Sequence, residues 1–439
     1  MNKMNTRTII FLAILVNLLS CRSTNNSSQN EFAEVNGEKI PIYRLDLVDD
    51  SATTIPLSTL FEEVEIIPIE TKPGCLVAYC SYTMTGHSVL TAANNFGAPI
   101  RLYEFDLEGK FIREYGGPGK GPGEHQGYMA GMVTWYPDEK LVMATFQGGS
   151  DEEHLFSDEG KFIKAIELPW ELGAGVLPLS DELYMTSGSI NGIPKYKRDS
   201  FQLVLFKENG EWVKGFPRYV YPPEGKTGYI SAANSSMWRY NNKWRIYSVG
   251  SDTLYQISID SLMPIAILNL GPSHITYNQF VEPHTQVGKY SIEILRESEQ
   301  HLFIKRQHLY KLEAKEWRPG QWSSVSYLNY SLMLYDKIQN KGYNLRFEDD
   351  ILGILPVETI QMNMSWDEYG SVCRIEQAVN VLEWIAEAKK NNAIPESARE
   401  RILELENSID ENSNPIMFRY KERNENKFKS RIEKSVSIN

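Results

Sequence analysis

A repeated alternation of apolar and polar residues organises the chain. Residues 102–112, LYEFDLEGKFI, alternate on both sides of a turn at Gly109, a pattern typical of two antiparallel strands joined by a tight hairpin. Similar segments turn at Gly160, Gly210 and Ser261, so the four turns lie 51, 50 and 51 residues apart. A fixed period of this length predicts propeller blades or solenoid repeats.

Each repeat has room for four strands, because two further alternating segments precede each hairpin. These segments are 76–82 and 88–92 before Gly109, 132–136 and 141–146 before Gly160, 175–179 and 183–187 before Gly210, and 230–238 and 244–249 before Ser261. Four strands in about fifty residues match one blade of a β-propeller.

The fifth repeat is stretched. A weaker hairpin turns at Asn340 to Gly342 after a longer interval, so residues 272–331 contain an insertion. We expect strands at 292–297 and 301–306, and a helix remains an alternative because the apolar spacing is mixed.

A helical hairpin is predicted at about 373–406. An apolar stripe runs along its first helix, and Pro395 begins a second helix that turns three apolar residues inward. The stripe comprises Ile375, Ala378, Val379, Leu382, Ile385 and Ala386, and the inward residues are Ile402, Leu403 and Leu405. Because strand character returns at 414–422, we expect the hairpin to be inserted within the last blade and packed on the side or rim of the propeller.

These segments together predict an all-β fold, a six-bladed β-propeller of four-stranded blades over residues 37–423. A strand is expected at 64–70. We also expect the N-terminal strand of the propeller to complete the blade ended by the C-terminal strand, because closure removes the exposed edges of a linear array. Seven blades is the alternative.

The two ends of the chain differ from this pattern. Lys3 and Arg7 precede a short apolar run, so residues 1–20 predict a secretory signal peptide. Residues 18–21, LLSC, resemble the bacterial lipoprotein signal box, which implies cleavage before Cys21 and lipidation of that residue; a secretion signal with a chance cysteine is the alternative. Residues 21–36 predict a flexible polar tether and 424–439 a charged tail that frays.

Charge and cysteine content exclude several classes. The formal net charge of −12 argues against nucleic acid or an anionic lipid surface as the main partner. The cysteines after Cys21 are Cys75, Cys80 and Cys373, an odd number without a CxxC pair, so we expect buried free thiols and neither a disulfide framework nor a zinc site. No cofactor and no metal is expected.

The loop before Gln126 holds two candidates. Residues 116–123 are glycine-rich, but two prolines remove amide donors and no Lys-Ser/Thr pair follows, so a crossing between blades is favoured over a phosphate site. Glu124 and His125 could be an acid/base pair. Adjacent residues on a strand point to opposite faces, however, so capping of the loop is favoured.

Aromatic residues near strand ends are the better functional candidates. Their faces suit sugar rings or peptide side chains, and packing between blades is the alternative interpretation. The residues are Trp135, Tyr136, Trp238, Tyr240 and Trp244. With no local catalytic motif, we predict a module that binds glycan, peptide or protein. A propeller hydrolase or lyase is the alternative, since such sites are assembled from several blades; its candidate acids are the clusters 151–153 and 349–350.

Several segments together resemble one family, the six-bladed β-propeller lipoproteins of Bacteroidetes, related in blade pattern to NHL-repeat propellers. The resemblance implies a propeller in the cell envelope, periplasmic or surface-exposed, and no established activity. The chain departs from the family at His125, where an aromatic residue is usual, and at 350–353, where a glycine pair is usual. The segments are LLSC (18–21), FEEVEIIPIET (61–71), FDLEGKFI (105–112), GPGEH (121–125), ESEQHLFI (297–304), YDK (335–337) and NPIMFRY (414–420).

Overall fold

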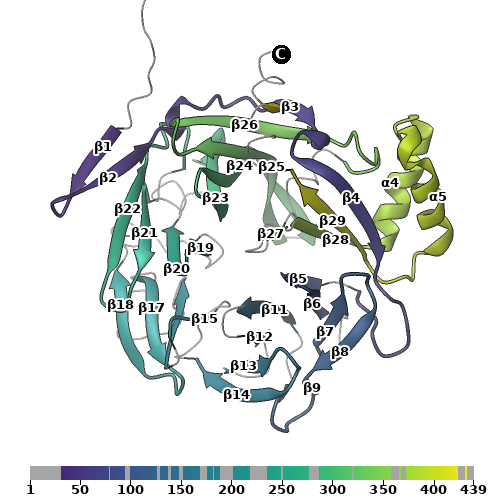
Figure 1. The fold of residues 1–439 in the computed structure, drawn as a ribbon, viewed down its shortest axis with the longest axis horizontal. Helices are drawn as coiled ribbons and strands as arrows, with labels where there is room; N and C mark the ends of the chain where they lie inside the picture. Colours follow the sequence, from purple (N-terminus) through teal and green to yellow (C-terminus); the bar gives the residue numbers. More distant parts are fainter. Residues whose placement is uncertain are drawn as a thin grey trace, which may run out of the picture.

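Six sheets surround a central axis in the computed structural model (Figure 1). The structure describes residues 31–78, 80–93, 99–125, 129–136, 140–147, 152–168, 176–180, 182–187, 201–217, 235–248, 251–275, 286–318, 321–356, 365–366, 372–423 and 431–432. Each sheet contains the four antiparallel strands of one blade, which confirms the six-bladed propeller and excludes seven blades.

The first four blades follow the chain in order. Blade one contains β5 (Cys80–Thr85), β6 (Ser88–Ala93), β7 (Arg101–Asp106) and β8 (Phe111–Tyr115), and blade two contains β11 (Met129–Tyr136), β12 (Leu141–Gln147), β13 (Glu152–Ser157) and β14 (Phe162–Glu167). Blade three contains β15 (Val176–Pro178), β16 (Leu183–Ser187), β17 (Phe201–Lys207) and β18 (Trp212–Pro217), and blade four contains β19 (Ser235–Tyr240), β20 (Lys243–Ser248), β21 (Thr253–Ile257) and β22 (Leu262–Leu268).

The predicted hairpin turns are present in these blades. Gly109, Gly160 and Gly210 have φ of 82°, 81° and 73°, a left-handed conformation that glycine adopts without steric cost. At Gly109 a Cβ would also lie 2.5 Å from the carbonyl oxygen of Pro68. This position therefore requires glycine for space as well as for backbone conformation.

Blade six closes the ring with strands from both ends of the chain. It contains β27 (Ser365–Trp366), β28 (Val372–Glu376), β29 (Ile416–Glu422) and, outermost, β4 (Phe61–Pro68). Strand β4 pairs antiparallel with β29, from Phe61 opposite Glu422 to Pro68 opposite Ile416. The prediction that an N-terminal strand completes the last blade is confirmed.

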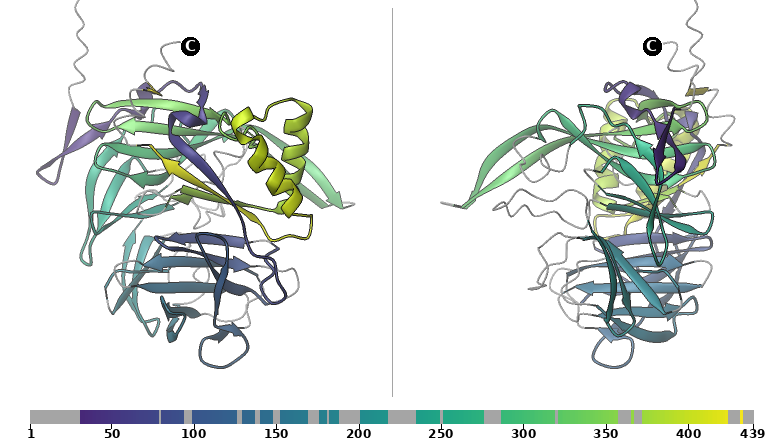
Figure 2. Two further views of the ribbon diagram at one scale, coloured as in Figure 1. Left: turned by 45° about the vertical axis from the view of Figure 1, so that its right-hand side comes forward. Right: turned by 90° about the vertical axis from the view of Figure 1, so that its left-hand side faces the viewer.

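Blade five carries the insertion predicted between the repeats. It contains β23 (Lys289–Glu297), β24 (His301–Arg318), β25 (Gln321–Asp336) and β26 (Lys341–Glu348). The hairpin of β24 and β25 stays paired from His301 opposite Asp336 to Arg318 opposite Gln321. Its outer half projects from one face of the ring as the long green strands of Figure 2. The helix considered for this stretch is wrong.

Three N-terminal strands add to the outer edges of blades. β1 (Glu31–Val35) and β2 (Glu38–Tyr43) form a hairpin whose second strand runs parallel to β22, and β3 (Thr53–Pro56) runs parallel to β26. The prediction of a flexible tether is therefore wrong for residues 31–35. Asn36 and Gly37 adopt φ of 53° and 85°, which folds the chain back into a paired hairpin.

The helical hairpin lies between β28 and β29, as predicted, and packs on the outside of the ring (Figure 1). It consists of α4 (Ala378–Lys390), the short 3₁₀ helix η5 (Glu396–Ala398) and α5 (Arg399–Ser408). Among the described helices, none is long and apolar enough to cross a bilayer. Buried residues of both helices share one core with residues of blades five and six, so packing on the propeller is confirmed. Those helical residues are Ala378, Val381, Ile385, Ala388, Ile402 and Leu405.

Three details of the C-terminal prediction are wrong. Residues 373–376 belong to strand β28, so the helix begins five residues later than predicted and its buried stripe is shifted. Val379 on α4 is consequently exposed, at 43%, and Leu403 on α5, which was expected to point inward, is 52% exposed. In the charged tail, Ile432 is buried in the same core, because an isolated apolar side chain is more stable out of water.

The cysteine prediction is confirmed for the two thiols that the structure describes. Cys75 and Cys373 are buried and free, and both belong to the core beneath blades one and six. Burial raises the pKa of the Cys75 thiol, so the reactive thiolate is disfavoured there.

Candidate functional site: a polar pocket in blade five

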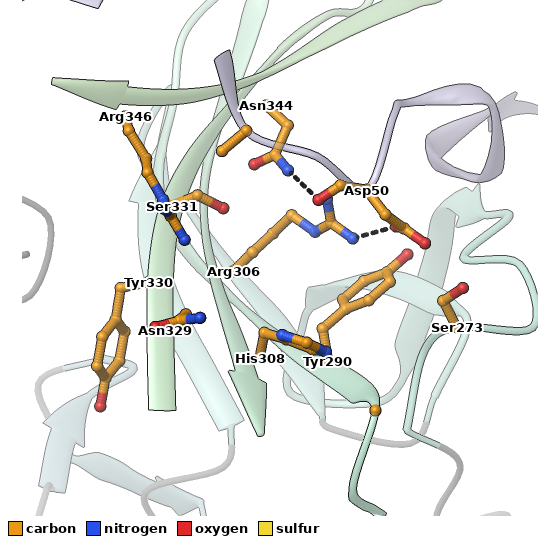
Figure 3. Close-up of a pocket in the computed structure, with 12 residues that line it drawn as sticks. Asp50, Ser273, Tyr290, Arg306, His308, Asn329, Tyr330, Ser331, Asn344 and Arg346 are labelled. Carbon is orange, nitrogen blue, oxygen red and sulfur yellow. Dashed lines mark hydrogen bonds and ion pairs between the residues drawn. The ribbon is translucent and has the colours of Figure 1, made fainter. Parts of the chain in front are cut away.

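A cavity of about 100 Å³ lies against one face of blade five. The face is polar because alternate residues of three adjacent strands point to the same side. In the strand register Tyr290 lies opposite His308, His308 opposite Asn329, and Arg306 opposite Ser331. Asn344 and Arg346 of β26 continue this face, and Asp50 and Ser273 approach it from loops (Figure 3).

The opposite face of the same strands is apolar. Leu345 and Phe347 alternate with Asn344 and Arg346, and both are buried in the core that also holds the helical hairpin. This packing fixes the register of β26, since a shift by one residue would exchange the two faces. The polar side chains are therefore held on a rigid element.

Arg306 is the most deeply buried cation of the pocket, with 4% of its surface exposed. Its Nη2 lies 2.5 Å from Oδ1 of Asp50, and its guanidinium carbon lies 3.8 Å from the centre of the Tyr290 ring, a cation–π geometry. Tyr290 is itself fixed because its hydroxyl donates to the carbonyl oxygen of Leu270 at 2.7 Å. Burial raises the pKa of the Tyr290 hydroxyl, opposed by the charge of Arg306.

Two buried polar atoms of the pocket have no partner in the described part of the chain. They are Nε of Arg306 and Oδ1 of Asn344. The Asn344 amide orientation is set by its nitrogen, which donates to the carbonyl oxygens of Asp50 at 2.9 Å and Asp49 at 3.3 Å. A buried polar group without a partner costs about 1–3 kcal/mol, so a donor-and-acceptor ligand would be stabilised here.

Arg346 supplies a second, uncompensated positive charge. It forms no hydrogen bond or ion pair with any residue that the structure describes, and Figure 3 shows its guanidinium pointing down toward Ser331 and Asn329. Asp50 is the carboxylate of the lining, and its side chain is 60% exposed. A chain with a net charge of −12 thus presents a cationic pocket, which favours an anionic group.

Glu124 stabilises the glycine-rich loop to which it belongs. The carboxylate Oε2 of Glu124 accepts a hydrogen bond from the amide of Gly121 at 2.8 Å. The short strands β9 (Gly117–Pro118) and β10 (Glu124–His125) pair in parallel and close the loop. Because the protein's own carboxylate occupies this amide, a phosphate would be repelled there.

Glu124 and His125 do not form an acid/base pair. The Glu124 side chain is exposed whereas His125 is buried on the opposite face. Burial, reinforced by the charge of His154, lowers the pKa of His125 to about 4, so this imidazole is neutral near pH 7. A cavity of about 370 Å³ nevertheless adjoins the loop and is lined by both residues.

The aromatic candidates mostly join neighbouring blades. The Tyr136 hydroxyl donates to the carbonyl oxygen of Val176 at 2.8 Å, and Nε1 of Trp238 donates to Glu297 at 3.1 Å. Tyr136 is 1% and Trp238 is 8% exposed, so the expectation that these two present open faces is wrong, because contacts between blades bury them. Trp135 is half-buried, with its ring centre 6.1 Å from that of His87, and ligand binding there stays a prediction.

The acidic pair at 349–350, a candidate for catalysis, is engaged in the fold. Asp349 is buried, and its carboxylate accepts the amides of Leu352 at 2.8 Å and of Ile354 and Leu355 at 3.0 Å. Asp350 accepts the amide and hydroxyl of Ser58 at 2.8 and 2.5 Å. Asp151 lies outside the described residues. Within the described ranges, no group of three or more His, Cys, Asp or Glu residues could hold a metal ion.

The polar pocket was not among the sites predicted from the sequence. Its residues lie in and around the stretched fifth repeat, where no strand register could be assigned. A signal exists in hindsight, because polar residues alternate at 306 and 308, at 329 and 331, and at 344 and 346. Alternating polar residues in the middle of a blade would have indicated a polar sheet face.

The fold and the pocket define a class, a closed six-bladed β-propeller with a polar cavity on one blade. The chain belongs to the family described as "Domain of unknown function (DUF4934)", whose sequence profile matches residues 42–421.

Two solved structures from Bacteroides resemble the chain. A "putative exported protein" from Bacteroides fragilis is 15% identical with a TM-score of 0.58, and the match covers 87% of this chain and 99% of that one. A member of the DUF4221 family from Bacteroides vulgatus is 12% identical with a TM-score of 0.46, covering 83% and 98%. The first supports the propeller fold alone. No curated protein matches.

Proposed function

We propose that this protein is an extracytoplasmic binding module that recognises a glycan, peptide or protein at the polar pocket of blade five. The observation that carries the proposal is the combination of an uncompensated Arg346 with two unsatisfied buried atoms, on Arg306 and Asn344. Such a preorganised set of polar groups lowers the cost of binding, because few side chains must be ordered when the ligand enters.

A propeller hydrolase or lyase is the alternative function. Its candidate carboxylates at 349 and 350 are occupied by amides and by Ser58, so neither is poised to transfer a proton to a substrate. Binding without turnover is therefore the favoured reading of the site.

The location proposed is the bacterial cell envelope, periplasmic or surface-exposed, with the chain anchored through lipid on Cys21. The LLSC segment at 18–21 and the exported relative from Bacteroides fragilis support an extracytoplasmic position. Acyl chains contribute about 0.8 kcal/mol per buried CH₂, and two or more make the attachment stable.

One experiment separates binding from catalysis. The full mature chain in detergent is incubated with arrays of glycans and peptides, and both retention and product are measured. Retention without product, lost in Arg346→Gln and kept in Arg399→Gln, supports the proposal. Arg399 is the matched control because it lies on α5 with its side chain 64% exposed. Product formation, absence of retention, or retention unchanged in Arg346→Gln would contradict it.

A further inference from the structure

We propose that the blade-five pocket takes the carboxylate end of an acidic sugar, a hydroxylated carboxylate such as a uronic acid residue. This inference rests on the proposed binding function and deepens it by naming the ligand class.

The charge of the site selects an anion. Of the three ionic side chains in the lining, Arg306 is already paired with Asp50, whereas Arg346 has no partner among the described residues. A guanidinium presents its N–H groups in a planar fork that matches a carboxylate with two parallel hydrogen bonds. Nε of Arg306 adds a further buried donor without a partner in the described chain.

The hydrogen-bonding complement requires more than an anion. Oδ1 of Asn344 is an acceptor, and its orientation is fixed because the amide nitrogen is held by the carbonyl oxygens of Asp49 and Asp50. A ligand that carries a hydrogen-bond donor to this position would satisfy it. A hydroxyl next to a carboxylate supplies this donor, whereas an anion without a neighbouring hydroxyl, such as inorganic sulfate, has no O–H to donate.

The size and lining limit how much of the ligand enters. A cavity of about 100 Å³ is smaller than the pockets of about 300–1,000 Å³ that enclose a whole drug-sized ligand. It therefore holds a carboxylate with a neighbouring hydroxyl and leaves the rest of the glycan outside.

The lining is rich in short hydroxyl, amide and imidazole side chains, among them Ser273, Ser331, Asn329 and His308. Many hydrogen-bonding groups in a small volume suit a polyhydroxylated ligand better than the apolar side chains of a peptide. Tyr290 is fixed beneath Arg306 and does not have to move to admit it.

Two residues of the lining lie at the foot of the projecting hairpin. His308 and Asn329 are opposed in the register, and beyond them β24 and β25 continue as the hairpin that leaves the ring. A glycan extending from the pocket would thus run beside this hairpin, where Tyr310 is 46% exposed.

The test is calorimetric titration of the full mature chain in detergent with four probes of matched length. The probes are digalacturonic acid, its methyl ester, a sulfated galactose disaccharide and an Asp-containing dipeptide. We expect binding of the uronide and none of the ester, because esterification removes the charge and leaves the hydroxyls. In Arg346→Gln the affinity should fall about tenfold to a hundredfold, the range for loss of a charge-assisted hydrogen bond. Arg346→Lys should recover part of the loss and Arg399→Gln should bind as wild type.

Several results would overturn the inference. Equal binding of the ester would show that the pocket does not recognise the ligand's charge, and tighter binding of the sulfated sugar would show that the pocket does not select a carboxylate. Binding of the dipeptide without the uronide would reject the sugar acid but leave the binding module intact. Turnover of any probe would instead reject the proposed function itself.

Discussion

Replacing Asp349 with alanine should destabilise the propeller strongly, because its carboxylate organises the turn after β26. Its carboxylate accepts amides of the turn that follows β26, with donors at Leu352, Ile354 and Leu355 that are themselves buried. Removal of the carboxylate leaves three buried N–H groups without their acceptor. At about 1 kcal/mol each, the lower end of the cost of an unsatisfied group, the loss is about 3 kcal/mol.

The measurement is urea unfolding followed by tryptophan fluorescence, with Asp350→Ala as the matched control. Asp350 is adjacent and exposed and bonds Ser58 at the surface, so its loss should cost less than about 1 kcal/mol. The variants should differ in midpoint and keep the same slope with denaturant, because the surface exposed on unfolding is unchanged. If Asp349→Ala and Asp350→Ala shifted the midpoint equally, the argument that Asp349 organises the turn would be refuted.

Three further predictions follow from the fold. Val64→Asp places a charge in β4, where Val64 is fully buried. This variant should prevent closure of blade six, so β29 should lose its hydrogen-exchange protection earlier than in the wild type. Protection of β29 equal to that of the wild type would contradict closure. Gly109→Ala should destabilise more than Gly37→Ala, since both have positive φ but only Gly109 also has a carbonyl oxygen 2.5 Å from the new Cβ; equal midpoints in thermal unfolding would reject the steric reason. Burial, together with the charge of Arg306, lowers the pKa of His274 from 6.5 to about 4, so the unfolded chain binds this proton first and stability should fall as pH drops from 6.5 to 4. His274→Gln should make that fall shallower by about 1.4 kcal/mol per pH unit, and an unchanged slope would show that His274 is not buried as a neutral group.

The repeat made the ring predictable because hairpin chemistry is local. A hairpin with a left-handed glycine between two alternating strands can be recognised within a dozen residues of sequence, as at Gly109 and Gly160. A constant spacing between such hairpins then indicates blades. The edge pairing of β4 with β29 could be argued as well, since an open array leaves hydrogen-bonding groups exposed.

The polar pocket was not predicted because it depends on the register between distant strands. Arg306, Ser331 and Arg346 come from three strands of a stretched repeat, and the sequence did not place them on one face. The aromatic residues near strand ends suggested a ligand surface. Trp238, however, donates a hydrogen bond to Glu297 of the next blade, a residue 59 positions away in the chain. Only the packed ring distinguishes an open aromatic face from a contact between blades.

The helix register failed for a similar reason. An apolar stripe beginning at Ile375 fits a helical period, but residues 372–376 pair with β29 as a strand. Tertiary pairing therefore overrides the local pattern, and the buried side of α4 begins at Ala378 instead.

The most direct test of the account is a crystal structure of the mature chain with digalacturonic acid. The account predicts the carboxylate of one sugar between Arg306 and Arg346, with a hydroxyl donating to Oδ1 of Asn344 and the second sugar at the foot of the β24–β25 hairpin. A ligand bound in another part of the ring, or a cleaved sugar in the crystal, would contradict it.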